Sequence, residues 1–162
     1  MYMLRVIKIG LVAAVCLWGA LSALGNVLDW EGTLGAVRAV STMTAWEGGA
    51  GDWRATSSPV LITAAAVLIV VFKVTAALLC GLGAVHMWRE RHGDVGLFGR
   101  AKALALTGCG IALLGLFLGW IVLGEQWFEM WRSPQLGAAG AAAFRYAGFI
   151  GLIAVFVAIR EE

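Results

Sequence analysis

The sequence predicts an all-α integral membrane protein, a bundle of four transmembrane helices in a single domain. Hydrophobic residues make up 61% of the 162 residues and charged residues only 14%, a balance far from that of soluble globular domains. Four apolar runs are each long enough to cross the hydrocarbon core of a bilayer. Between the last two runs, residues 120–134 are rich in tryptophan and glutamate, a composition typical of a membrane–water interface.

The predicted spans cover residues 4–25, 59–87, 101–123 and 138–159. The first span begins with Arg5 and Lys8, so a cleaved signal peptide is the alternative, but its length favours a retained helix. Ser58 and Pro59 are a good cap and first residue for the second span. At 1.5 Å per residue that span would measure about 43 Å, so we expect it to tilt or to project beyond the core.

The connector at residues 26–57 is too long for a simple turn. Leu34, Val37 and Val40 recur at helical spacing, which predicts a short helix lying along the interface, with an irregular loop as the alternative. We expect this connector and the 120–134 segment to form a cap on the outer side of the bundle.

Basic residues near the ends of the spans predict the orientation. Seven lie on the side that holds both termini, and four lie on the opposite side. The seven are Arg5, Lys8, Arg89, Arg91, Arg100, Lys102 and Arg160, and the four are Arg38, Arg54, Arg132 and Arg145. Both termini are therefore predicted to face the cytoplasm, in a bacterial inner membrane.

Four motifs occur at the ends of the predicted spans. They are Asn26-x-x-Asp29, Trp53-Arg54-Ala55, Trp127-Phe128-x-Met130-Trp131-x-Ser133 and Phe144-Arg145-Tyr146. With these motifs, nearly the whole chain resembles the bacterial predicted small integral membrane proteins (domain of unknown function 2165). The resemblance implies a four-helix inner-membrane protein and no established activity.

Two positions depart from the pattern of that family. Lys73 stands in the middle of the second span, where an acidic residue is usual, and the Asp that is usual near Met43 is missing. A role that depends on those two carboxylates therefore does not carry over to this chain.

Lys73 is the one charged residue deep in a predicted span. A lysine at mid-membrane costs roughly 2.5–3.5 kcal/mol on insertion scales, so it should face protein or water, or snorkel along its helix. Because no carboxylate of the chain lies at that depth, we expect a partner from outside the monomer: an acid of another chain, an anionic lipid or water.

At the outer rim, Arg145 is expected to pair with Glu125 or Glu129, and Asn26 and Asp29 end the first span on the same side. A structural clamp is favoured over a ligand or headgroup site here. The nearby rings of Trp127 and Trp131 are further candidates for contact with a partner or ligand.

No cofactor is predicted. His86 and His92 are only six positions apart, which argues against bis-histidine haem, and no cluster of metal ligands is evident. Cys16, Cys80 and Cys109 each fall within an apolar run and are expected to be packing residues. A bound lipid or quinone remains compatible with the sequence.

The sequence leaves three classes of function open. The first is an interaction protein, an accessory or assembly subunit that contacts the bilayer and another membrane chain or a second copy of itself. The second is an oligomeric carrier of a small molecule or ion, and the third is a membrane enzyme acting on a quinone or lipid. The sequence favours a non-enzymatic role because no nucleophile–base pair, phosphate loop or HExxH is present. A net charge of +2 without a basic run argues against nucleic acid.

Overall fold

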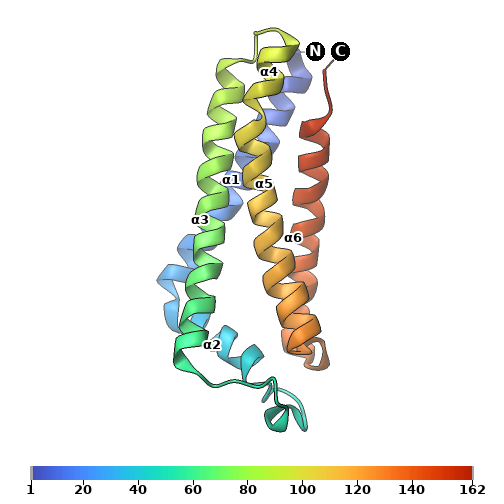
Figure 1. Cartoon of the computed structure of the whole chain (residues 1–162). Coiled ribbons are helices and arrows are strands. Elements are labelled where there is room, and N and C mark those ends of the chain that lie inside the picture. The colour runs from blue at the N-terminus through green and yellow to red at the C-terminus, as the bar shows by residue number, and fades with distance from the viewer. Residues whose placement is uncertain (1, 162) are drawn as a thin grey trace.

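Four long helical segments run side by side in the structure, a computed structural model that describes residues 2–161 (Figure 1). They are α1 (Tyr2–Leu28), α3 (Pro59–Arg89), a continuous segment from Val95 to Trp127, and α6 (Pro134–Ala158). Each is long and apolar enough to cross a membrane. The predicted four-helix transmembrane bundle is thereby confirmed.

The third span is built from three consecutive helical pieces. A short helix, α4 (Val95–Ala101), leads into α5 (Ala103–Leu116), and the chain then continues without a break as the π-helix η2 (Phe117–Trp127). A single-turn 3₁₀ helix, η3 (Met130–Arg132), connects it to α6.

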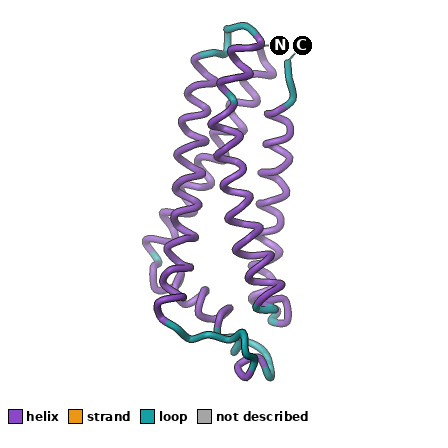
Figure 2. The backbone as a smooth tube through the Cα atoms, viewed as in Figure 1, coloured by secondary structure: helices purple, strands orange, loops and turns teal. Residues whose placement is uncertain are grey.

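Both termini and α4 lie at one end of the bundle, which we call the terminal end (Figure 1). Helix α2 (Trp30–Ser41) and the connector between α2 and α3 lie at the opposite end, which we call the distal end (Figure 2). The predicted arrangement with both termini on one side therefore agrees with the structure.

The helix ends differ from the predicted ones by a few residues, and local capping explains the earlier start of α6. Helix α6 begins at Pro134 because the Ser133 side chain accepts a hydrogen bond from the backbone N–H of Leu136, and proline suits the first turn. At α3, Pro59 occupies the predicted first position, but the Ser58 side chain makes no capping bond.

The helix expected within the connector is present as α2. Asp29 caps it by accepting from the N–H of Gly32 at 3.1 Å. After α2, Gly48 takes a left-handed conformation with φ of 80° and leads into the single 3₁₀ turn η1 (Gly49–Gly51). The connector then runs across the distal end to Pro59 (Figure 2).

Small residues bring α3 and α5 into close contact in the terminal half of the bundle. Gly83 lies against the backbone of Ala105, and a β-carbon at Gly108 would lie 2.7 Å from both the backbone nitrogen and the sulfur of Cys80. Cys80 and Cys109 are fully buried here. Close approach through small residues is typical of membrane helices, and the predicted packing role of these two cysteines agrees with their burial.

Candidate functional site: a cleft in the distal half

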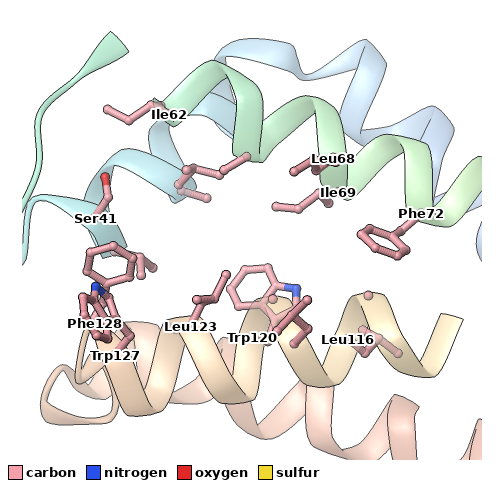
Figure 3. Close-up of a pocket in the computed structure, with 18 of the residues that line it drawn as sticks. Ser41, Ile62, Leu68, Ile69, Phe72, Leu116, Trp120, Leu123, Trp127 and Phe128 are labelled. Atoms are coloured by element: carbon pink, nitrogen blue, oxygen red, sulfur yellow. The ribbon is translucent and has the colours of Figure 1, made fainter. Parts of the chain in front are cut away.

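Toward the distal end α3 and η2 move apart (Figure 1), and a cleft of about 390 Å³ lies between them. Phe72 and Leu116 lie at its deep end, and Ser41, Trp127 and Phe128 lie at its distal end (Figure 3). The volume falls in the range of sites for drug-sized ligands, roughly 300–1,000 Å³. The cleft is therefore large enough for a small lipophilic molecule.

The separation of the two helices follows from where large side chains replace small ones. Just before η2 begins, α5 still lies close to α3 at Gly115, where a β-carbon would lie 2.9 Å from the β-carbon of Phe72. Beyond it, Trp120 and Leu123 face Ile69 and Leu68 across the cleft (Figure 3). These bulky side chains cannot interdigitate as closely as glycine and alanine do in the terminal half.

The π-helix η2 forms one wall of the cleft. The N–H of Phe128 donates to the carbonyl of Leu123, five residues back, at 2.9 Å, which is the π pattern. Such segments are rare and often occur at functional sites. Here the wider turn presents Trp120, Leu123 and Trp127 to the same space.

The cleft opens sideways, toward the region that lipid tails would occupy. Leu61 and Leu68 on α3 are 58% and 54% exposed, and Leu118 and Leu123 on η2 are 41% and 45% exposed. All four also line the cleft. A molecule dissolved in the bilayer could therefore enter between α3 and η2 without crossing the polar cap.

Lys73 lines this largely apolar cleft. Its ammonium Nζ donates to Oδ1 of Asn26 at 2.6 Å. The amide of Asn26 is held in turn, because its Nδ2 donates to Oγ1 of Thr33 at 3.0 Å. Lys73 therefore has a neutral contact within the monomer, because its long side chain reaches the end of α1, and the expected partner from outside the monomer stays a prediction.

The contact with Asn26 does not neutralise the charge of Lys73. An amide oxygen is a neutral acceptor, and one hydrogen bond uses only one of the three ammonium donors. Within residues 2–161, Lys73 forms no salt bridge. Its charge is therefore unpaired among the residues that the structure describes.

The distal rim is held by a network around Arg54. Its guanidinium contacts Asp52 at 2.8 Å and Glu129 at 3.0 Å, and Nη1 donates to the carbonyl of Trp127 at 2.9 Å. The ring of Trp53 also meets the ring of Trp127 edge-on, with centroids 5.5 Å apart. The connector is thereby joined to the end of η2 beside the cleft.

At neutral pH the two carboxylates of this network are ionised, which favours their salt bridges with Arg54. Hydrogen bonds from Arg54 lower the pKa of Asp52 to about 2. The same guanidinium, with a smaller contribution from Arg132, lowers the pKa of Glu129. Both carboxylates therefore stay charged well into the acidic range, and the rim contacts persist with them.

The predicted Arg145 clamp is wrong. Among the described residues Arg145 is exposed and makes no ion pair, whereas Glu129 pairs with Arg54 and Arg132. Glu125 lies against Gly140 of α6 instead. Arg145 points away because its position on α6 faces outward, between the exposed rings of Phe144 and Tyr146.

The other predicted rim residues have separate roles. Asp29 caps α2 and does not join an ion pair, and Asn26 contacts Lys73. Trp127 lines the cleft, whereas Trp131 is 61% exposed beyond it. The structure therefore brings Lys73 and Trp127 to the cleft, with Asn26 against Lys73, and places Glu129 at the adjoining rim.

Sequence reasoning missed a buried charge cluster at the terminal end. Lys8 and Lys102 donate to the two carboxylate oxygens of Glu161 at 2.7 and 2.9 Å, and both also donate to the carbonyl of Ile159. The three side chains are at most 4% exposed. In the sequence, Lys8 and Lys102 indicate only the orientation of the spans. Nothing in the Glu-Glu pair that contains Glu161 indicates that this side chain is buried.

The histidines and other possible metal ligands do not cluster in the described part of the chain. No set of three or more metal-ligating side chains comes together between residues 2 and 161. His92 stacks on Tyr2, with ring centroids 4.9 Å apart, and His86 is exposed on α3.

The four apolar spans define the class of protein, a small four-span integral membrane protein. A family model described as "predicted small integral membrane protein (DUF2165)" matches residues 4–160. The chain belongs to this family, as its aromatic and polar motifs predicted. No match was found among curated proteins or among solved structures.

Proposed function

We propose that this protein binds a lipophilic small molecule of the membrane in the cleft between α3 and η2. The observation that carries the proposal is an apolar, laterally open cleft of about 390 Å³ with a single cation in its wall. Pockets that combine an apolar lining with few polar groups are typical binding sites for small molecules. A lipid or quinone, already compatible with the sequence, fits this class.

The accessory-subunit role that the sequence favours depends chiefly on a Lys73 without a partner in the monomer. Asn26 contacts Lys73 without pairing its charge, so an external anion is still expected, and the cleft that Lys73 lines favours a small molecule over a protein carboxylate. The cleft supports the alternative, binding or carriage of a small molecule, and we propose no catalytic step.

A glycine in the cleft wall allows a direct test. Gly119 lines the cleft, and a β-carbon there meets nothing within 4 Å, so Gly119→Phe should fill the cleft without a clash. Gly110→Phe is the matched control, because Gly110 lies on the same span with equally open surroundings and does not line the cleft. Native mass spectrometry after mild detergent extraction would compare bound molecules.

The expected result is that wild-type protein and Gly110→Phe retain the same lipophilic molecule, whereas Gly119→Phe loses most of it. Equal occupancy in all three proteins would contradict the proposal.

We further propose that the protein resides in a bacterial inner membrane with its terminal end in the cytoplasm. Seven basic residues near the ends of spans on that side against four on the other support this orientation. A membrane-impermeant thiol reagent applied to intact cells should label a cysteine placed at Gly51 or Gln135, both exposed at the distal end, and miss one at Gly93. Labelling at Gly93 alone would reverse the orientation.

A further inference from the structure

We propose that the molecule bound in the cleft is an anionic amphiphile, with an apolar tail in the cleft and an acidic oxygen headgroup on Lys73. This inference rests on the proposed function and deepens it by naming the class of ligand. The shared chemistry is a carboxylate or phosphate oxygen attached to a hydrocarbon chain.

The first argument is charge. Lys73 is the one cationic side chain among the residues that line the cleft, and no acidic side chain lines it. Among residues 2–161 its one side-chain hydrogen bond goes to the neutral amide of Asn26. A cation in an apolar, membrane-embedded wall is costly unless it is paired. An anionic headgroup supplies the opposite charge that residues 2–161 do not.

The second argument is positioning. The amide of Asn26 accepts from Lys73 and donates to Thr33, and the Thr33 hydroxyl donates back to the carbonyl of Asn26 at 3.0 Å. This arrangement holds the ammonium of a cleft-lining side chain beside the end of α1 and leaves two of its three donors for a ligand. Charge-assisted bonds from a held ammonium are the stronger kind.

The third argument concerns the rest of the lining. Phe72, Ile69, Leu116, Trp120 and Leu123 offer apolar surface, and few polar groups join them (Figure 3). A hydrocarbon tail satisfies such a surface, whereas a compact polar anion does not. Tail and headgroup are therefore both required, which selects an amphiphile over a free inorganic anion.

Brominated fatty acid provides a direct probe, because bromine quenches nearby tryptophan and Trp18, Trp120 and Trp127 line the cleft. Full-length protein in nanodiscs of neutral phosphatidylcholine would be titrated with dibromostearic acid and with its uncharged methyl ester. We expect saturable quenching by the acid at concentrations roughly tenfold or more below those needed for the ester, the factor that one charge-assisted bond contributes.

Lys73→Met should abolish this preference for the acid, and Lys73→Arg, which keeps the charge, should preserve most of it. Competition then distinguishes the source of the headgroup: displacement by oleic acid indicates a free fatty acid, and displacement by phosphatidic acid indicates an acidic phospholipid. Either displacement supports the inference.

Two results would overturn it, and they differ in what else they overturn. If acid and ester bind equally and Gly119→Phe abolishes both, the inference fails while the proposed function stands. If neither probe gives saturable quenching beyond that of Gly119→Phe, both fail.

Discussion

Glu161→Gln is expected to destabilise the protein by about 3–5 kcal/mol, the cost of removing one partner from a buried ion pair. The substitution keeps the shape of the side chain but leaves the ammonium groups of Lys8 and Lys102 without an opposite charge. Lys8 is fully buried, so water cannot replace the lost carboxylate. Unfolding in mixed detergent micelles, followed by circular dichroism, would measure the change in free energy.

Two further variants identify charge as the cause. Lys8→Met combined with Glu161→Gln restores the original net charge of the cluster, so the double variant should be more stable than Glu161→Gln alone. Glu31→Gln, at an exposed position on α2, should change stability little. A double variant whose loss equals the sum of both single losses would contradict the account.

The same cluster predicts how stability depends on pH. Burial by itself raises the pKa of the Glu161 carboxyl, but the hydrogen bonds and charges of Lys8 and Lys102 together outweigh burial and lower it. A carboxyl with a lowered pKa contributes stability above its ordinary pKa of about 4.3. This contribution should be lost as the pH falls through the folded-state pKa, and Glu161→Gln should remove that part of the pH dependence.

Gly108→Ala should give the second large effect, a loss of about 1–3 kcal/mol. The added methyl group would lie 2.7 Å from the backbone nitrogen of Cys80 and 3.1 Å from the carbonyl oxygen of Ala76. Backbone atoms cannot move aside as a flexible side chain can, so α3 and α5 must separate. The same unfolding assay in detergent micelles would detect the loss.

Gly110→Ala is the matched control, because it lies on the same helix with nothing within 4 Å of its β-carbon. Alanine favours a helix over glycine, so this control should be neutral or slightly stabilising. Equal stability of the two variants would mean that the close contact at Gly108 does not hold the terminal half together.

The apolar runs were sufficient to predict the four spans, because a membrane helix needs only length and hydrophobicity. Motifs such as Trp53-Arg54-Ala55 were sufficient to indicate the family. The π-helix at Phe117–Trp127 was not predictable, because the same apolar composition suits an α-helix equally well.

Long-range partners account for most of what the sequence did not reveal. Glu161 is 153 positions from Lys8, and its burial depends on where the chain turns after α6. Arg54 takes the place expected for Arg145 because the path of the connector brings it to Glu129, and no spacing rule gives that path. The cleft itself arises where α3 and η2 diverge. The relative position of two helices does not follow from the apolar pattern of either helix alone.

Photo-crosslinking tests the central claim, occupancy of the cleft, most directly. Protein reconstituted in vesicles with a trace of diazirine-bearing fatty acid would be irradiated, digested and mapped by mass spectrometry. Adducts are expected to concentrate on Phe72, Leu116 and Trp120, and to decrease when excess unmodified fatty acid competes. Adducts spread evenly over lipid-facing residues outside the cleft, such as Leu78 and Leu152, and unaffected by competition would contradict the account.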